Sequence, residues 1–440
     1  MTELDEALAE LGDWLRIPSV STAGGDGPAL TRSCDWVCER IEAAGGSAEA
    51  VSVDGGHPMA VGELRTARSG APTVLAYGHH DVQAAGPLEL WESPPFEPTE
   101  RAGRIYARGA ADDKGNFLPL LHVACALARA GELPVNVRFL VEGEEEIGSP
   151  SVLKRLRTGE DDADCAIVFD SLMVDERTPA ITLAARGLVQ ARVEVRTAER
   201  DLHSGLYGGT VLNAAHVLMA MLAEVAPDAQ GRVRPELAAG VLEPSDEERA
   251  SWERLPSGES MIRRVGAAPV AGDAAERFHE RTGAATAVDV NMIEVGEPRT
   301  IVPALARGHV TVRIAAGQTA AEVGPELERL LRSAVPDGAT ATIHVEGADP
   351  ALFDPDDPAL QLALGAMERA CGTPAALVRL GGTLPLLAVL ADRGITSIVS
   401  GFALPEDAFH APNESYRLES LRLGEAAARE LYAALAELPS

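Results

Sequence analysis

Five short segments contain the residue types that could do chemistry in this chain. In chain order they are GHHD (78–81), GAADDKG (109–115), EGEEEIGS (142–149), VFDS (168–171) and FHAPNE (409–414). Histidine nitrogens and carboxylate oxygens together suit a borderline cation such as zinc, cobalt or manganese. Carboxylates that converge on one site repel one another unless cations neutralise them. The segments therefore predict two divalent metal ions that share a bridging carboxylate and a bridging water, whose pKa such a pair lowers towards about 7.

Taken singly, each of these segments has a simpler explanation. His79 and Asp81 could be a hydrogen-bonded couple, and the acids before Lys114 could favour a helix N-terminus. The run of glutamates could be a solvated turn, Asp170 a helix cap and His410 an ordinary loop histidine. What favours the metal site is that all five segments occur together, in loops that follow or adjoin expected strands.

Apolar runs that alternate with helical patterns predict the elements that position these segments. Helical spacing is expected over 4–15, 33–44 and 116–130, the last ended by Gly131. Buried strands are expected over 73–77, 135–141, 165–169 and 396–399. This alternation indicates an α/β layer with a largely parallel central sheet flanked by helices. In such sheets ligands bind in the loops beyond the strand ends, where three of the polar segments lie.

A different order of elements begins near residue 188. The pattern predicts strand 188–196, helix 210–225, strands 287–295 and 306–314, helix 319–333 and strand 340–345. That β-α-β-β-α-β order is the ferredoxin-like arrangement. A segment rich in proline, glutamate and arginine, 227–283, interrupts it. We therefore expect a discontinuous α/β domain, 1–186 and 351–440, interrupted by a smaller α+β domain, 187–350.

The composition argues against several classes of partner. With 67 acidic and 38 basic residues the net charge is −29, which leaves no basic footprint for nucleic acid or for an anionic membrane surface. The five cysteines form no CxxC pair, and the stretch MTELDEALAELGDWL is acidic and amphipathic, unlike a signal peptide. No apolar run approaches the ~18 residues that span a bilayer. These features predict a reduced, cytoplasmic protein.

Longer motifs around these segments resemble a known family. They are GHHDVQ, WESPPFEP, GRIYARGAADDKG, EGEEEIGSP, FDS, DLHSGLYGG, TIVP, RLGGTLP and FHAPNE, which together span about 75–414. In that order they are similar to the dinuclear-zinc metallopeptidases, a superfamily of aminoacylases, deacetylases and carboxypeptidases. Within it, the segment DLHSGLYGG is most similar to the carnosinase-like dipeptidases.

The resemblance implies a role for each residue of the metal site. His79 and Asp170 would bind one metal ion, Glu146 and His410 would bind the other, and Asp112 would bridge the two. The cofactors implied are two divalent ions per subunit, with zinc favoured and manganese or cobalt as alternatives.

Two further acids are implied to assist the metal pair. Asp81 would hydrogen-bond the far nitrogen of His79 and fix its tautomer. Glu145 would be the general base, which takes a proton from the bridging water and later gives it to the leaving amine. The family also has a cis peptide bond at the pair that matches Asp112 and Asp113.

A second group of residues is implied to contact the substrate. Arg313, Gly382 and Thr383 would hold its C-terminal carboxylate. His203 and Thr300 would reach the active site of a partner subunit, where the histidine stabilises the tetrahedral oxyanion. A homodimer follows from this assignment, because a monomer would lack part of its own site.

The leading hypothesis is therefore metal-dependent hydrolysis of a dipeptide, with closure of the smaller domain over the site. One alternative with the same metals and base is an N-acyl- or N-carbamoyl-amino-acid amidohydrolase, and another is a non-catalytic binding protein on this fold. The chain departs from the family at His80, where an aromatic residue is usual, and this histidine could act as a decoy ligand. The sequence leaves the preferred dipeptide open.

Overall fold

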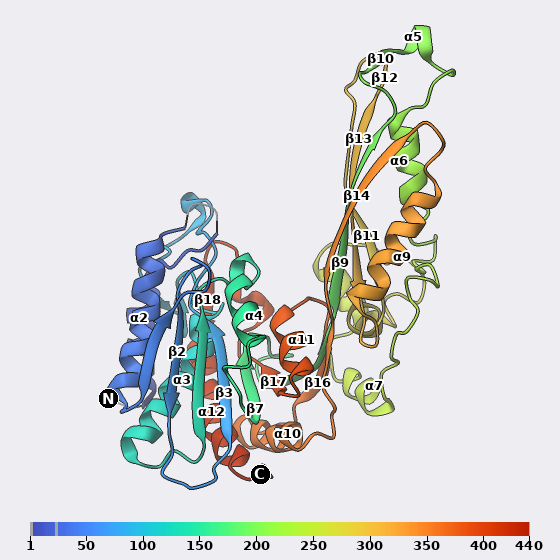
Figure 1. The fold of residues 1–440 in the computed structure, drawn as a ribbon. Helices are drawn as coiled ribbons and strands as arrows, with labels where there is room; N and C mark the ends of the chain where they lie inside the picture. Colours follow the sequence, from blue (N-terminus) through green and yellow to red (C-terminus); the bar gives the residue numbers. More distant parts are fainter. Residues whose placement is uncertain (1–2, 23–24, 440) are drawn as a thin grey trace. The chain divides into compact units, whose positions relative to one another are not determined.

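The computed structural model describes residues 3–22 and 25–439 (Figure 1). The chain divides into two compact units. The first comprises Met1–Leu183, Phe353–Leu377 and Val389–Ser440, and the second comprises Ala184–Leu352 and Val378–Ala388. The chain therefore leaves the first unit twice and returns to it twice.

A mixed sheet forms the centre of the first unit. Its strands run in the order β1 (Ser47–Val51), β2 (Met59–Leu64), β6 (Asn136–Glu142), β3 (Thr73–His79), β7 (Cys165–Phe169), β17 (Thr396–Ser400) and β8 (Ala180–Ala185). The short strands β15 (Ala351–Leu352) and β16 (Ala376–Leu380) pair with β8, where the chain passes from one unit to the other. Neighbours among β6, β3, β7 and β17 are parallel, whereas β1, β2 and β8 pair antiparallel. The central strands are almost wholly buried, as is usual in parallel sheets. The predicted α/β fold with a largely parallel sheet is confirmed.

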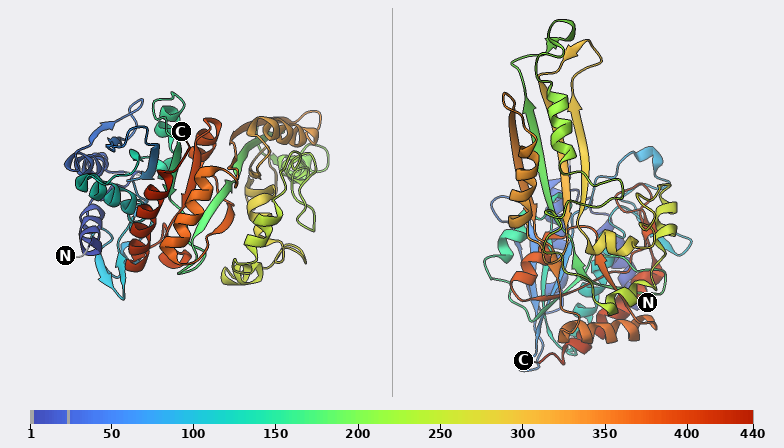
Figure 2. Two further views of the ribbon diagram at one scale, coloured as in Figure 1. Left: turned by 90° about the horizontal axis from the view of Figure 1, so that it is seen from below. Right: turned by 90° about the vertical axis from the view of Figure 1, so that its right-hand side faces the viewer.

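Helices flank this sheet (Figures 1 and 2). The helices are α1 (Glu3–Leu15), α2 (Gly27–Ala43), α3 (Lys114–Ala130), α4 (Pro150–Leu156), α10 (Pro358–Cys371) and α12 (Leu418–Leu435). The unit also contains the turns η1 (Leu88–Leu90), η2 (Glu145–Ile147) and η4 (Pro405–Asp407), and a small sheet of β4 (Thr99–Arg101), β5 (Arg104–Tyr106) and β18 (Ser415–Arg417). The helix α11 (Pro385–Asp392) spans a unit boundary. As predicted, α3 ends at Gly131, whose left-handed backbone (φ 71°) suits glycine. The helix α2 begins earlier than predicted, because Asp26 caps it by accepting the N–H of Ala29.

Buried aromatic residues join the first three helices. The rings of Trp14 and Trp36 stack with centroids 4.7 Å apart, and Phe117 of α3 meets Trp14 edge-on at 6.2 Å. The indole N–H of Trp14 donates to Oγ of Ser33 at 2.8 Å. Aromatic pairs of this kind contribute about 0.5–1.5 kcal/mol beyond the area they bury. They hold the first turns of α3, which begins directly after the GAADD segment.

The polar segments lie where the parallel strands end. His79 is the last residue of β3 and Glu142 the last residue of β6, and the two are partners across the ladder. Asp170 follows the last residue of β7. Because the carboxyl ends of parallel strands meet at one edge of a sheet, side chains from distant parts of the chain gather there. The structure confirms this placement and extends β3 beyond the predicted 73–77, to His79.

The second unit has a four-stranded antiparallel sheet with two helices on one face (Figures 1 and 2). Its elements are β9 (Gly187–Arg196), α6 (Ala214–Ala223), β11 (Ala287–Val295), β13 (Leu305–Ile314), α9 (Ala320–Ser333) and β14 (Thr340–Ala348), and the strand order is β11-β13-β9-β14. Leu218 of α6 and Leu327 of α9 share one core with Val193 of β9. The predicted ferredoxin-like order is confirmed. The helix α6 starts later than predicted, because Asn213 caps it by accepting the N–H of Ala215 at 2.8 Å.

The segment 227–283 forms short helices. They are α7 (Asp246–Trp252), α8 (Gly258–Arg264) and the π-helical turn η3 (Glu280–Ala284), which runs one residue past the segment. Ser245 and Glu248 form a capping box at the start of α7, and Glu248 also forms a buried ion pair with Arg379 at 2.6 Å. One end of the unit carries β10 (Leu202–His203), α5 (Ser204–Tyr207) and β12 (Ile301–Val302).

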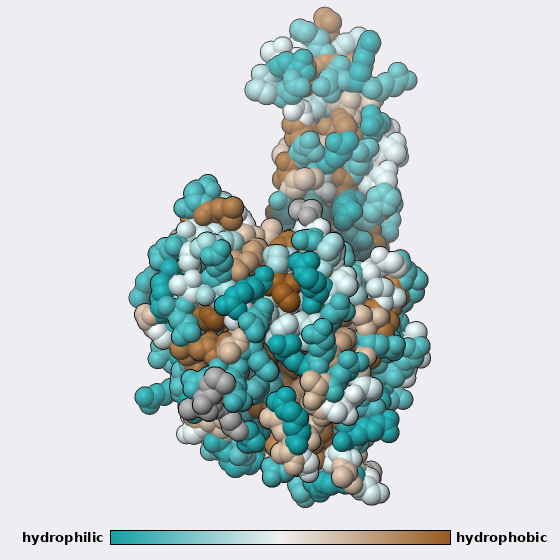
Figure 3. Space-filling model, turned by 90° about the vertical axis from the view of Figure 1, so that its left-hand side faces the viewer, coloured by the Kyte–Doolittle hydropathy of each residue, from teal (hydrophilic) through white to brown (hydrophobic). Residues whose placement is uncertain are grey.

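Hydrophilic residues predominate on the face drawn in Figure 3, where hydrophobic residues form small separate patches. This agrees with the net charge of −29. Among the described residues, no helix has the length and apolar character needed to cross a membrane.

Candidate metal centre

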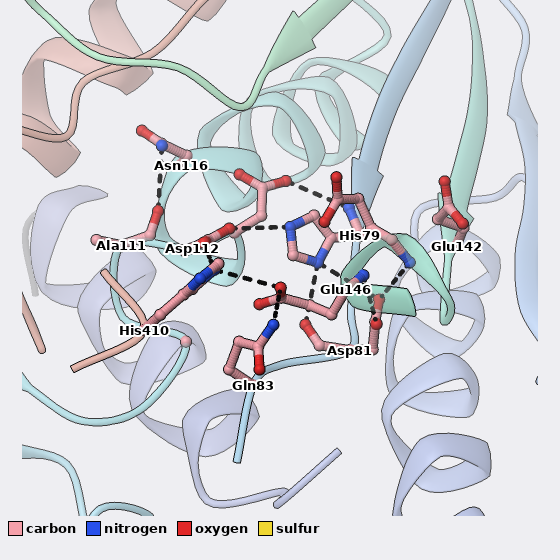
Figure 4. Close-up of polar contacts among 12 residues, drawn as sticks. His79, Asp81, Gln83, Ala111, Asp112, Asn116, Glu142, Glu146 and His410 are labelled. Carbon is pink, nitrogen blue, oxygen red and sulfur yellow. Dashed lines mark hydrogen bonds and ion pairs between the residues drawn. The ribbon is translucent and has the colours of Figure 1, made fainter. Parts of the chain in front are cut away.

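Two groups of potential metal ligands meet at the strand ends of the first unit (Figure 4). One group contains His79, Asp112 and Asp170, and the other contains Asp112, Glu146 and His410. Within each group the donor atoms lie within 4.8 Å of one another. The structure thus brings together the five residues that the sequence predicts as ligands, with Asp112 in both groups. A carboxylate shared in this way has the position of a bridging ligand.

Asp112 directs one carboxylate oxygen at each histidine. Its Oδ1 is 3.0 Å from Nε2 of His79, and its Oδ2 is 2.9 Å from Nε2 of His410. The same nitrogen of His410 lies 3.2 Å from Oε2 of Glu146. The carboxylate is therefore oriented to connect two positive centres, either imidazolium groups or metal ions.

The electrostatics of the site favour bound cations. Burial disfavours protonation of His79, yet hydrogen bonds to neighbouring aspartates raise its pKa well above the usual value. Hydrogen bonds to Asp112 and Glu146 raise the pKa of His410 to about 10. Burial raises the pKa of Asp170 well above the usual range, and nearby carboxylates add to this effect. A divalent metal ion supplies positive charge without a proton, so it would take the place of the protons on the histidines and reduce the repulsion between the carboxylates.

A buried oxygen tests whether a metal ion fits. Oε1 of Glu146 is buried and has no hydrogen-bond partner among the described residues. Its Oε2 accepts a hydrogen bond from Nε2 of Gln83 at 2.8 Å and faces His410. Leaving a buried carboxylate oxygen unpaired costs free energy, and a metal ion bound by it would remove that cost. The set of two imidazoles and three carboxylates fits zinc or a similar divalent ion.

Asp81 orders the turn that carries two glutamates. Its carboxylate accepts the backbone N–H groups of Glu145 and Glu146, both at 3.2 Å. The hydroxyl of Ser21 donates to the same carboxylate at 2.5 Å. Nδ1 of His79 lies 3.0 Å from the backbone carbonyl oxygen of Asp81 and 3.4 Å from its carboxylate. His79 is thus closer to the main chain of Asp81 than to its carboxylate, which was the expected partner, because three other donors already hydrogen-bond that carboxylate.

Glu145 begins the turn η2 beside the ligand groups. Burial and repulsion from Asp112 and Glu146 raise its pKa to about 7, although His79 opposes the shift. A carboxyl group with such a pKa can accept and return a proton near neutral pH. This is the property that a general base needs.

Glu414 and Arg108 form a buried ion pair that sequence reasoning did not single out. Their side chains are 0% and 2% exposed. Oε2 of Glu414 accepts hydrogen bonds from Nη1 of Arg108 at 2.5 Å and from the N–H of Gly109 at 3.0 Å. Its Oε1 accepts those of Ala111 at 2.9 Å and Asp112 at 3.1 Å. The available signal was the position of Glu414 inside the FHAPNE motif.

Arg108 connects this pair to two more loops. Its Nη2 donates to the carbonyl oxygens of Ala84 at 3.2 Å and Ala411 at 3.3 Å. Ala84 lies in the loop that follows His79, and Ala411 is next to His410. The pair therefore joins three loops that carry predicted ligands.

The residues beside two ligands take structural positions. The peptide bond between Asp112 and Asp113 is cis, as the resemblance implies, and Oδ2 of Asp113 accepts the N–H of His79 at 3.2 Å. His80 is fully buried, and its Nε2 lies 2.9 Å from the carbonyl oxygen of Pro58. Burial lowers the pKa of His80 to about 4. It belongs to neither ligand group, so the expectation that it could be a decoy ligand is wrong.

A family model matches most of the chain. Peptidase family M20/M25/M40 matches residues 75–434. The chain belongs to this family. Cysteinylglycine-S-conjugate dipeptidase of Corynebacterium striatum is 31% identical over 332 residues, which are 73% of this chain and 71% of that protein. Human Beta-Ala-His dipeptidase is 27% identical over 357 residues, which are 78% of this chain and 70% of that protein.

Solved structures of other proteins share the fold. An M20 family metallo-carboxypeptidase from Sulfolobus solfataricus, Sso-CP2, matches with a TM-score of 0.86 at 25% identity, covering 99% of this chain and 100% of that chain. Human carnosine dipeptidase 1 matches with a TM-score of 0.78 at 24% identity, covering 99% and 97%.

In this M20 family member, the predicted carboxylate-binding residues lie together in the second unit. Nη1 of Arg313 in β13 donates to Oγ1 of Thr383 at 2.8 Å. Gly382 directly precedes Thr383, and a β-carbon at Gly382 would have no neighbouring atom within 4 Å. The backbone beside this pair is therefore open to a ligand.

His203 is in β10 and Thr300 directly precedes β12, at the end of the second unit that carries α5 (Figure 1). His203 pairs with Ile301 in the β10–β12 ladder, and the N–H of Ser204 donates to the carbonyl oxygen of Thr300 at 3.0 Å. His203 is exposed, and its Nδ1 accepts the N–H of Gly205 at 3.1 Å. The structure places these two predicted residues side by side.

Proposed function

We propose that this protein is a metal-dependent dipeptidase that uses two divalent ions, with zinc as the first candidate. The observation that carries the proposal is the position of Asp112 between His79 and His410, with one oxygen directed at each. Membership of peptidase family M20/M25/M40 and relatives named as dipeptidases support the same reaction. The amidohydrolase alternative is not favoured, since these relatives are named for dipeptides.

The ligand groups suggest how the ions would be held. His79 and Asp170 would bind one ion, Glu146 and His410 would bind the other, and Asp112 would bridge them. When bound, such a pair supplies a water of lowered pKa and polarises the scissile carbonyl.

Glu145 moves the proton in this proposal. It accepts the proton of the attacking water and returns it to the nitrogen of the leaving amine as the peptide C–N bond breaks. The pKa of about 7 supports this role. Asp81 supports it as well, because its carboxylate holds the backbone N–H of Glu145 at 3.2 Å and so orients the turn.

Residues of the second unit would select the substrate. Arg313 and Thr383, with the backbone at Gly382, would bind the C-terminal carboxylate, which limits cleavage to the bond one residue away. His203 and Thr300 would act on the partner's substrate in a homodimer, with residues 187–350 as the lid and dimerisation domain. A cytoplasmic location is supported by the five free cysteines.

Amine release tests this proposal. Chelator-treated protein is reconstituted with zinc or manganese and offered dipeptides, tripeptides, N-acyl amino acids and N-carbamoyl amino acids. We expect cleavage of dipeptides alone. Cleavage confined to the N-substituted amino acids would support the amidohydrolase instead, and no turnover with two ions bound would refute the enzymatic proposal.

Two variants serve as controls for this measurement. Glu145→Gln removes the base and should lower turnover by about 10²–10⁴ while two ions stay bound. Glu176→Gln makes the same change at an exposed position of the first unit and should behave as wild type. Metal content is measured for both, so that loss of the base is separated from loss of the ions.

A further inference from the structure

The segment 227–283 and the start of β11 line an open cavity of about 750 Å³ within the second unit. This volume is typical of sites that bind small molecules. The walls are largely apolar and include Val233, Val241, Met261, Ile262 and Phe278. No residue of this cavity belongs to the predicted metal or carboxylate sites.

Most charged side chains at the cavity wall are neutralised by ion pairs. Arg281 pairs with Asp273 at 2.9 Å. Glu280 pairs with Arg277 and, at 2.9 Å, with Arg249. The remaining pairs are Arg232 with Asp228 and Glu243 with Arg249. Because these charges satisfy one another, the wall presents chiefly apolar surface to an occupant.

The cavity adjoins the predicted carboxylate-binding pair along the sheet. Ala287 of β11 lines the cavity and is the direct cross-strand partner of Arg313. Cross-strand partners have β-carbons about 5 Å apart. Asp289, two residues on, also lines the cavity and lies on the same face as Arg313. Arg313 itself contacts Thr383, so the cavity begins one strand away from that pair.

Arg186 joins the cavity wall to the carboxylate site from a second side. Its buried guanidinium donates to the carbonyl oxygen of Gly381 at 3.1 Å, and Gly381 is next to Gly382. The same group donates to the carbonyl oxygens of Ala285 at 3.3 Å and Arg281 at 3.4 Å, both in residues that line the cavity. One buried side chain therefore fixes the spacing between the two features.

We propose that this cavity is the subsite for the side chain of the substrate's C-terminal residue, and that it makes large apolar residues preferred there. The inference rests on the proposed dipeptidase function. The α-carbon of that residue is bonded to the carboxylate that Arg313 would hold, and Ala287, the cross-strand partner of Arg313, lines the cavity, so the cavity lies within reach of the side chain. Each methylene group that is buried against an apolar wall makes binding more favourable, whereas glycine has no side chain to bury there.

Filling the cavity tests the proposal. In the wild type we expect kcat/KM for Ala-Phe and Ala-Leu to exceed that for Ala-Gly at least tenfold. Ile262→Trp should reduce this ratio at least fivefold and change kcat/KM for Ala-Gly by less than twofold. Ser260→Trp introduces the same tryptophan side chain on the same helix at an exposed position outside the cavity wall, and it should preserve the ratio. Val265→Trp, at a wall position that is 76% exposed, provides a second filling variant if the first folds poorly.

Three other results would overturn the subsite, its apolar character or the proposed function. Equal loss for all dipeptides in the filled variants, or a wild type that shows no preference, would overturn the subsite. A preference for lysine or arginine that Asp289→Asn removes would overturn its apolar character. If the wild type cleaves no dipeptide, the proposed function fails, and calorimetry with free phenylalanine and alanine then tests the cavity separately. Tighter binding of phenylalanine that is lost in Ile262→Trp would support the cavity as an apolar site.

Discussion

Replacing Glu414 by glutamine should destabilise the protein and weaken metal binding together. The carboxylate accepts four hydrogen bonds, one from the buried Arg108 and three from backbone N–H groups between 109 and 112. Glutamine keeps the shape but offers only one acceptor oxygen, and its amide nitrogen is itself a donor. The NH₂ group of the glutamine would therefore point at N–H groups that need an acceptor.

The size of the loss follows from burial. Both side chains are at most 2% exposed, so Arg108 would keep its charge away from water without a partner. Removing one member of a buried ion pair typically costs about 3–5 kcal/mol, and we expect the free energy of unfolding to fall by that amount. The loop that carries Asp112 would also lose its anchor. Loss of such supporting contacts typically weakens metal binding by about 10- to 100-fold.

Urea unfolding and metal competition measure the two effects. Unfolding of the first unit is followed by tryptophan fluorescence, and zinc affinity is measured against a chelator of known strength. Glu419→Gln is the matched control, because Glu419 pairs with Arg422 at the surface, where both are about half exposed, and should cost less than about 1 kcal/mol. A Glu414→Gln protein within 1 kcal/mol of wild type, with unchanged zinc affinity, would refute the reasoning.

Three further perturbations test the metal and carboxylate sites. Glu145→Gln should lower kcat by about 10²–10⁴ with two ions still bound, as measured by amine release and metal analysis; unchanged kcat would exclude Glu145 as the base. Arg313→Lys should raise KM for dipeptides more than it lowers kcat, because an ammonium group cannot form the two-pronged contact; steady-state kinetics showing the reverse would contradict this. Metal-free protein should lose stability as pH rises. Folding raises the pKa of Glu145 from 4.5 to about 7 and that of His410 from 6.5 to about 10. Each group therefore contributes its full stabilisation below its ordinary pKa, and this stabilisation is lost as the pH rises through the raised pKa. A Tm series on chelated protein, with zinc-loaded protein as the flat control, checks the sign, and a rising Tm would count against it.

The elements that carry the site could be predicted because their signals are local. The apolar run 165–169 is β7 as predicted, and α3 ends at Gly131 as predicted. The β-α-β-β-α-β order of the second unit was likewise predicted from local apolar patterns. By contrast, α7 was not predicted, although the sequence Ser245-Asp-Glu-Glu248 carries the spacing of a capping box. The composition of 227–283 obscured that signal.

The contacts around the ligands could not be predicted in the same way. Glu414 and the loop it holds are 302 or more residues apart in the chain, and nothing local marks a carboxylate as buried. His80 shows the opposite case, since its neighbours in sequence suggest a ligand while its ring is turned to Pro58. The partners of polar side chains depend on which loops meet, and that is decided by the assembled sheet.

The buried pair of Arg108 and Glu414 also bears on how metal binding and folding are related. Asp112 and His410 are separated by 298 residues, and closing a loop of that length is entropically costly. In this structure protein hydrogen bonds to Glu414 and Arg108 already hold the loops that carry both residues. Because the ligands are already in position, little of the free energy of metal binding is spent on ordering the chain, and the affinity for the metal is higher. The same contacts therefore stabilise the first unit and prepare the predicted metal site, which is why one substitution at Glu414 should reduce both.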